Sequence, residues 1–251
     1  MDIKEFFKRI LYYVSVPKCV LCKEKLDYED RGLCKKCKIE YDRHKTRDCP
    51  TCGKILSRCS CSYEKLEAHG IKKFIKIFRY SKAEQSFSSN YLIYSLKQDN
   101  RADVLSFLSE ELADAIKSSV DLTSSDFVIT NVPRRKKAVV NFGYDHAKAL
   151  AVSTAKILGI EYVSLLKSKS KVAQKTVHGE ERMRNAKFDY ICDEDFTLKG
   201  KTVIIIDDII TTGASITNCA TLIKGLRPKA IIAACLGTAY KEKYIEFTNP
   251  R

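Results

Sequence analysis

The C-terminal two-thirds of the chain alternates between two patterns of apolar residues. Short continuous apolar runs, such as the β-branched stretch at residues 201–206, are typical of strands buried on both faces of a parallel sheet. Between these runs, apolar residues recur at the spacing of helices that cover a core with one face. We expect strands at residues 71–80, 127–132, 162–166, 188–191, 201–206 and 230–235, and helices at residues 101–118, 144–158 and 214–226. This alternation predicts a doubly wound α/β domain on a parallel sheet.

Residues 19–61 are poor in long apolar runs. Residues 1–18 predict a short amphipathic helix that packs on the body of the protein, with membrane contact as the alternative. Charged residues interrupt its apolar positions, which argues against a signal peptide. No stretch of the sequence approaches the roughly 18 apolar residues of a membrane span, so we expect a soluble, cytoplasmic protein.

Eight of the eleven cysteines fall within residues 19–61. Most form CxxC pairs, and each such turn presents two sulfur ligands to one tetrahedral ion. The segment is therefore expected to fold around two structural zinc ions, Zn(2+), with disulfides as the alternative. The predicted ligands are Cys19, Cys22, Cys34, Cys37, Cys49, Cys52, Cys59 and Cys61. The pairs can combine sequentially or interleaved, and the spacing leaves both orders open. The other three cysteines, Cys192, Cys219 and Cys235, are expected in the core.

A loop that follows the most apolar predicted strand has the composition of a phosphate site. It begins with the acidic pair Asp207 and Asp208 and leads into the helix predicted at 214–226. Backbone N–H groups at a helix N-terminus bind phosphate, and carboxylates beside them accept hydrogen bonds from ribose hydroxyls. The predicted phosphate ligands are Thr211, Thr212, Gly213, Ala214 and Ser215. The pattern predicts a ribose 5-phosphate site; the alternative is an ordinary helix cap at a strand end. Neither GxGxxG nor GxxxxGK[ST] occurs in the sequence.

The chain carries a formal charge of +14, concentrated before residue 81. A polyanionic partner such as nucleic acid is therefore reasonable, although charge alone implies no specificity. In residues 71–80, basic residues alternate with aromatic ones, as in surfaces that bind single strands. We predict contacts to single-stranded DNA from Lys72, Lys73, Lys76 and Arg79. The alternative is that the aromatic side chains of this segment pack the two parts of the chain together.

Residues 167–180 are rich in Ser and Lys, too polar to pack and too long for a plain connection, and predict a mobile lid. Three further segments, residues 94–99, 131–135 and 174–185, together with the phosphate loop and the cysteine pairs, resemble the ComF family of competence-associated proteins. The segment Phe142-Gly-Tyr-Asp-His146 differs from the Gly-Phe-Asn-Gln usual there, and Asn131 replaces the first proline of the family's Pro-Val-Pro.

The resemblance implies a type I phosphoribosyltransferase-like fold that binds phosphoribosyl pyrophosphate (PRPP). By this resemblance the pyrophosphate would be faced by Arg134, Arg135 and Lys136, with Arg182 or Arg184 closing from the lid. Magnesium, Mg(2+), would bridge the phosphates, because hard cations prefer oxygen ligands. The alternative for residues 134–137 is a solvated charge run.

We expect three parts: the helix at 1–18, a double zinc finger module at 19–62 and the phosphoribosyltransferase-like domain at 63–251. Two functions are compatible with them. The family resemblance implies handling of single-stranded DNA during natural transformation, alongside proteins of the DNA-uptake machinery. The alternative is an enzyme that transfers ribose 5-phosphate to a nitrogen acceptor, which needs positioning and charge stabilisation rather than a dedicated base. The sequence predicts neither a catalytic residue nor the acceptor.

Overall fold

The computed structural model describes residues 16–45, 49, 52–55, 58–59, 61–80, 88–169, 188–193, 195–239 and 247–248. The amphipathic helix expected at 1–18 lies almost entirely outside these residues, and so does most of the expected lid. Among the helices described, none is long and apolar enough to cross a membrane.

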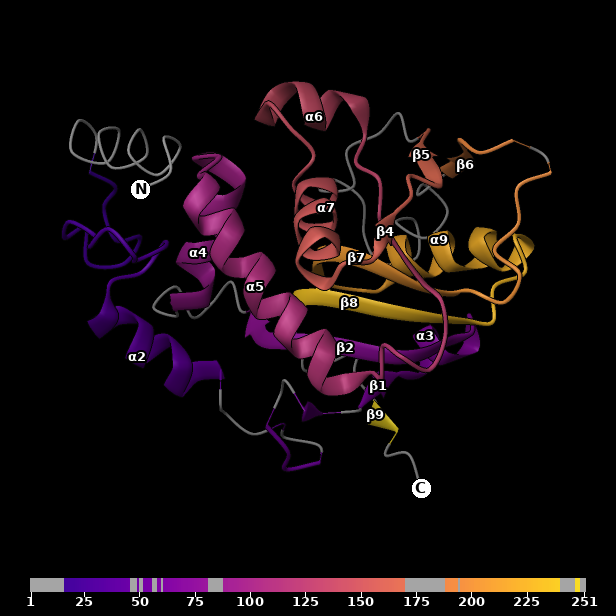
Figure 1. The fold of residues 1–251 in the computed structure, drawn as a ribbon, viewed down its shortest axis with the longest axis horizontal. Coiled ribbons are helices and arrows are strands. Elements are labelled where there is room, and N and C mark those ends of the chain that lie inside the picture. The colour runs from indigo at the N-terminus through magenta and orange to yellow at the C-terminus, as the bar shows by residue number, and fades with distance from the viewer. Residues whose placement is uncertain are drawn as a thin grey trace.

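A five-stranded sheet forms the centre of the molecule (Figure 1). Its strands are β2 (Ile71–Tyr80), β3 (Phe127–Asn131), β4 (Glu161–Tyr162), β7 (Thr202–Ile210) and β8 (Ala230–Ala239). They pair in the order β2-β8-β7-β3-β4, and every pairing is parallel. Because side chains of a strand alternate between faces, Ile204 and Ile206 pack on one side of β7 and Val203 and Ile205 on the other.

Helices cover both faces of the sheet. The core cluster on one face includes side chains of α4 (Ser88–Gln98), α5 (Ala102–Ser119) and α7 (His146–Leu158), and the cluster on the other includes α9 (Ala214–Gly225) and Leu66 of α3 (Glu64–Ala68). Figure 1 shows α5 and α7 in front of the sheet and α9 behind it. The doubly wound α/β arrangement predicted from the sequence is confirmed.

Two small antiparallel sheets complete the fold. β5 (Leu166–Ser168) pairs with β6 (Phe188–Tyr190), and β1 (Ser62–Tyr63) pairs with β9 (Phe247–Thr248). The single strand expected at 162–166 is wrong, because β4 ends at Tyr162 and the chain then leaves the central sheet for β5. The C-terminal pairing brings residues 247–248 next to the segment that follows Cys61.

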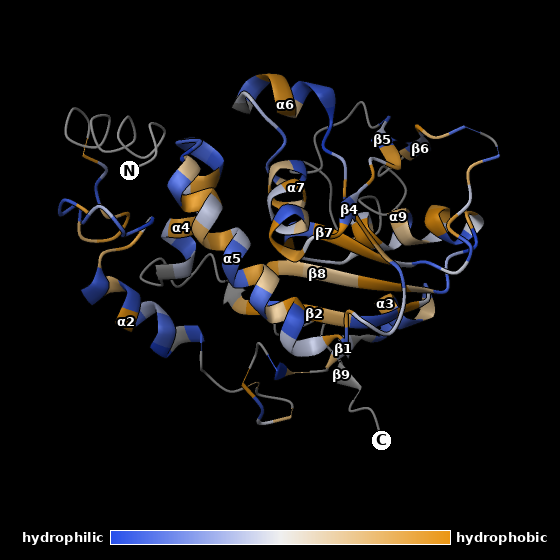
Figure 2. Ribbon diagram, viewed as in Figure 1, coloured by the Kyte–Doolittle hydropathy of each residue, from blue (hydrophilic) through white to orange (hydrophobic). Residues whose placement is uncertain are grey.

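The first cysteine-rich segment shares the core of the α/β domain. Residues Val20, Leu26, Leu33 and Tyr41 are buried in the same cluster as α5 and α7. Tyr41 belongs to α2 (Lys35–Lys45), which is mostly hydrophilic in Figure 2 and buries Cys37 and the Tyr41 ring in this cluster. α6 (Lys136–Phe142) is a separate short helix after β3, and Val140 on it is 80% exposed.

Candidate functional site

The turn between β7 and α9 lies at the carboxyl edge of the parallel sheet, where open α/β folds bind ligands. Gly213 turns the chain there with φ of 72°, a left-handed conformation that disfavours residues with a Cβ atom. Thr211 and Thr212 are exposed, Ser215 is half-buried, and Gly213 and Ala214 are buried beneath them. The first turn of α9, whose N–H groups lack intrahelical partners, thus begins directly after two exposed threonines, and Ala214 N donates to Thr212 Oγ1 at 3.4 Å.

Asp208, near the end of β7, is buried and ion-paired. Arg134 Nη2 lies 2.7 Å and Lys97 Nζ 2.9 Å from its Oδ2 atom. Burial alone would raise the pKa of Asp208, but the two cationic side chains hold it well below its ordinary value. The carboxylate is therefore ionised, and it gathers two cations from different parts of the chain.

Asp207 directly precedes Asp208 in β7, so its side chain points to the opposite face of the sheet. It lies in register with Cys235 of β8. Burial, and after it the Asp207 charge, raises the pKa of Cys235 and Cys219, which both lie in the core cluster on the α9 side. Burial and the neighbouring Asp208 carboxylate raise the pKa of Asp207. The acidic pair therefore brackets the end of β7 from both faces.

Lys97 was not among the predicted site residues. Contacts from the start of α7 hold its backbone in place. Tyr144 Oη donates to the Leu96 carbonyl at 2.7 Å, and His146 Nε2 lies 3.0 Å from the Lys97 carbonyl. Burial and then the Arg134 charge lower the pKa of His146 to about 4, so its ring is neutral near pH 7. The resemblance of residues 94–99 to a family segment was the available indication for Lys97.

Asp145 was also missing from the predicted site. It caps α7 by accepting from Lys148 N at 3.1 Å and also accepts from the Arg134 backbone N at 3.1 Å. One carboxylate thus holds the start of α7 and the peptide that precedes the Arg134 side chain.

A pocket of about 180 Å³ opens beside Arg134, at the ends of β3 and β4. Its basic lining residues come from three segments: Arg134, Lys136, Lys148 and Lys167. Asp145 is its one acidic lining residue, and it is engaged by the two backbone N–H groups. The pocket therefore suits a small anion.

The remaining predicted residues lie elsewhere. Arg135 is the N-terminal cap of α6 and is half-buried, and Arg182 lies outside the described residues. Lys72 is exposed, whereas Lys73 Nζ donates to the Ser119 carbonyl, and the side chain of Arg79 is not among those described. The expected DNA contact from Lys76 does not fit the structure, because Lys76 is 1% exposed and its Nζ donates to the Cys61 carbonyl at 2.7 Å.

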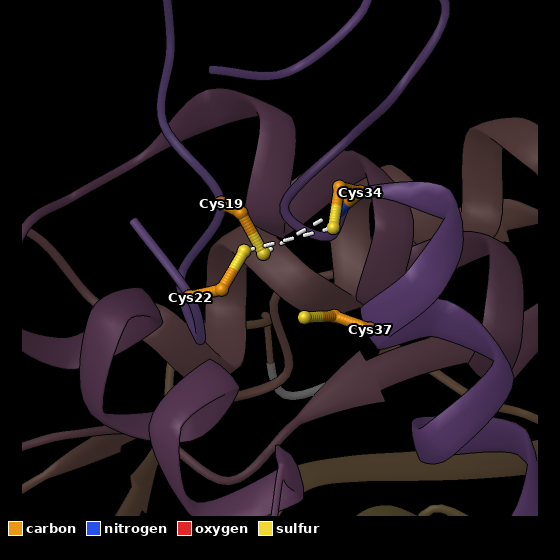
Figure 3. A group of neighbouring side chains, drawn as sticks. All are labelled: Cys19, Cys22, Cys34 and Cys37. Atoms are coloured by element: carbon orange, nitrogen blue, oxygen red, sulfur yellow. Dashed lines mark hydrogen bonds between the residues drawn. The ribbon is translucent and has the colours of Figure 1, made fainter. Parts of the chain in front are cut away.

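The eight predicted cysteine ligands form two groups that could each hold a metal ion. They combine sequentially: Cys19, Cys22, Cys34 and Cys37 form the first group, and Cys49, Cys52, Cys59 and Cys61 form the second. Within each group all sulfur atoms lie within 4.8 Å of one another, and Figure 3 shows the first four converging. His69 belongs to neither group; its Nδ1 lies 2.8 Å from the Lys65 carbonyl.

The sulfur separations fit a tetrahedral thiolate site. Cys22 and Cys34 Sγ lie 3.7 Å apart, and Cys52 and Cys59 Sγ lie 3.5 Å apart. A tetrahedron with metal–sulfur bonds of about 2.3 Å has edges of about 3.8 Å, whereas a disulfide needs about 2.05 Å. The described cysteines form no disulfide with one another, and their separations fit metal ions such as zinc.

Comparison with known proteins agrees with this architecture. The family model of the phosphoribosyl transferase domain matches residues 146–246. The chain is 27% identical over 226 residues to the Competence protein ComFC of Streptococcus pneumoniae, covering 82% of this chain and 93% of that protein. It is 32% identical over 123 residues to an adenine phosphoribosyltransferase of Yarrowia lipolytica, covering 49% of this chain and 62% of that protein.

Two solved structures overlap part of the chain. A purine phosphoribosyltransferase from Pyrococcus horikoshii has 21% identity and a TM-score of 0.35, covering 53% of this chain and 72% of that one. A hypoxanthine phosphoribosyltransferase from Staphylococcus aureus has 14% identity and a TM-score of 0.36, covering 53% and 62%.

The parallel sheet and the domain match define a protein of the phosphoribosyltransferase fold. Two cysteine groups precede that domain, and the competence relative aligns over most of both chains. These findings fit a ComF-family protein and agree with the resemblance found in the sequence.

Proposed function

We propose that the carboxyl edge of the sheet binds PRPP, with the 5-phosphate on the loop from Thr211 to Ser215. The observation that carries this proposal is the left-handed turn at Gly213, which starts α9 shortly after the end of β7, the strand that carries Asp207 and Asp208. Backbone N–H groups there suit a phosphate, and the carboxylates suit ribose hydroxyls.

The basic pocket supports the other end of the same ligand. Arg134 lines the pocket and also contacts Asp208, so one side chain spans the distance between the acidic pair and the pocket. The pyrophosphate of PRPP would lie against Arg134, Arg135 and Lys136, joined by Arg182 and by magnesium bound to phosphate oxygens.

Calorimetry with PRPP and magnesium tests this site. Asp207→Asn combined with Asp208→Asn removes the acidic pair, including the negative charge of Asp208, and this loss of charge by itself favours an anion. A loss of affinity of at least about tenfold therefore indicates lost ribose contacts rather than altered charge. Asp126→Asn, at an exposed carboxylate before β3, is the control and leaves the affinity unchanged. Equal affinities in wild type and double variant contradict the assignment.

We also propose that each cysteine group holds one zinc ion as a structural site. Four thiolates at tetrahedral separations are the usual donor set of such sites. Elemental analysis of the purified protein then gives close to two zinc ions per chain. Protein that is free of zinc, with its thiols oxidised to disulfides, contradicts the proposal.

As a biological role we propose the handling of single-stranded DNA in the cytoplasm, together with DNA-uptake proteins. The relative from Streptococcus pneumoniae is named a competence protein, and this chain has a formal charge of +14. Exposed Lys72 stays a candidate contact, whereas Lys76 does not.

Fluorescence anisotropy with single-stranded DNA tests this role. Affinity should fall with salt at a slope of about −0.7 per phosphate neutralised, and Lys72→Glu should weaken it. Product formation from PRPP and a free base without any DNA binding favours the transferase alternative.

A further inference from the structure

The second cysteine group leads directly to the phosphate loop. Cys61 is its last ligand, and α3 begins three residues later, at Glu64. Leu66 of α3 is fully buried, and a Cβ atom built on Gly213 would lie 3.3 Å from Leu66 Cδ2. The Leu66 side chain therefore packs against the left-handed turn from which the loop enters α9.

Lys76 fastens the same ligand residue to the central sheet. Its ammonium is buried, donates to the Cys61 carbonyl at 2.7 Å and lies 4.9 Å from the centre of the Phe74 ring. A buried ammonium without partners is costly, so this hydrogen bond specifies where Cys61 lies. Lys76 is in register with Cys235, and Cys235 is in register with Asp207. A row of three side chains on one face of the sheet thus joins Cys61 to the acidic end of β7.

Such contacts bear on affinity, because a phosphate-binding turn must hold several N–H groups in one arrangement. If the turn is loose in the free protein, the ligand has to order it, and that ordering subtracts from the binding free energy. Leu66 supplies a rigid apolar surface beneath the turn only while α3 stays in place. Cys61, the last thiol of the group, directly precedes β1, and α3 follows β1, so a fixed Cys61 restrains the position of α3.

We propose that Leu66 is a positioning residue for the phosphate loop, and that metal in the second cysteine group holds Leu66 in place. Metal in this group then raises the affinity of the loop for its ligand, and by linkage the ligand raises the affinity for the metal. The role of Leu66 in ligand affinity rests on the proposed PRPP site. The effect of Leu66 on the order of the turn at residues 211–215 is independent of that site.

The first test compares two buried leucines. Leu66→Ala should weaken PRPP binding about tenfold, equivalent to about 1.4 kcal/mol. Leu26→Ala removes the same atoms beside the first cysteine group, where Leu26 is 1% exposed, and should change the affinity less than about twofold. Leu66→Met, which nearly conserves volume, should restore most of the affinity. Equal losses in Leu66→Ala and Leu26→Ala overturn the proposal.

The second test measures the turn without any ligand. Hydrogen exchange at residues 211–215 should be faster in Leu66→Ala and in Cys52→Ser, which removes one ligand of the second group, than in wild type or Leu26→Ala. Cys52→Ser also serves if Leu66→Ala does not fold. Unchanged exchange at the turn in Cys52→Ser overturns the coupling. If wild type fails to bind PRPP while the exchange differences persist, the proposed function fails and the coupling stands.

Discussion

The two cysteine groups have the same four-thiolate chemistry but lie in different surroundings. The first is embedded in the main hydrophobic core, where Cys19 and Cys37 pack with Leu26 and Tyr41 against α5. Among the residues that the structure describes, the buried cluster around the second group consists of its own cysteines. Metal in the first group would therefore hold an apolar surface against the core, whereas the described residues of the second group offer little apolar surface.

The polar anchors of the two groups differ in the same way. The first segment docks on α5: Tyr41 Oη donates to Glu111 Oε2 at 3.1 Å, and Gly32 N donates to Asp103 Oδ2 at 2.9 Å. The second group is anchored through Lys76 and leads to Leu66, beside the candidate site. Two groups with the same four cysteine ligands can thus affect different parts of the protein, because each effect depends on the elements that flank the group. The first group is expected to govern stability and the second to govern the loop.

Removal of one ligand from each group should produce the largest effects. Cys22→Ser should lower the free energy of unfolding by on the order of 4 kcal/mol, because a lost metal frees the segment from the core. Cys52→Ser should cost less stability but more PRPP affinity. Denaturant unfolding, zinc content and calorimetry on both variants check this ranking. If Cys52→Ser loses more stability and Cys22→Ser loses more PRPP affinity, the proposed difference between the two groups is wrong.

Loss of the Glu111 carboxylate should have the next largest effect. Glu111 is buried and accepts from Tyr41 and Lys45, so Glu111→Ala should cost about 2–3 kcal/mol of stability by leaving both donors without this acceptor. Glu110→Ala, at a neighbouring half-exposed carboxylate paired with Arg31, should cost less than about 1 kcal/mol. Urea unfolding measures both. A loss of PRPP affinity in Glu111→Ala would contradict the division of roles.

Substitution of Gly213 tests the loop side of the comparison. Gly213→Ala places a Cβ in a left-handed turn and 3.3 Å from Leu66, at a cost of about 1–2 kcal/mol. Gly200→Ala meets similar backbone strain at φ of 83°, with nothing within 4 Å of the new Cβ. Both should lose similar stability in thermal unfolding, and PRPP affinity should fall in Gly213→Ala alone. Equal affinities would show that the contact with Leu66 does not matter.

Acid should reveal a smaller effect that belongs to neither cysteine group. The folded pKa of His146, about 4, lies below its ordinary value near 6.5, so the unfolded chain takes up the proton first. Its contribution to stability is complete above about pH 6.5 and is lost as the pH falls toward 4, with about 1 kcal/mol gone by pH 5.5. Because acid also releases metal from thiolates, the measurement is the difference between wild type and His146→Gln in urea unfolding at pH 7.5 and 5.5. An equal pH dependence in the two proteins contradicts this role.

Local patterns along the chain predicted most strands of the central sheet and the eight candidate cysteine ligands, but not how those ligands group. The β-branched run at the start of β7 predicted a buried parallel strand because it lacks polar positions, and CxxC spacing predicted metal groups because two sulfurs of one turn reach one ion. The acidic pair and the Thr-Thr-Gly turn placed the candidate loop between a strand and a helix without knowledge of any distant contact.

Long-range pairing decided the rest. Lys76 alternates with apolar residues just as an exposed lysine would, and only the position of Cys61 over β2 shows that its ammonium is buried. Lys97 reaches Asp208 because α7 holds the end of α4, and Leu66 of α3 packs against the distant turn at Gly213. Sequence periodicity shows which face of an element is apolar, whereas a charged side chain's partner depends on residues that lie far away along the chain.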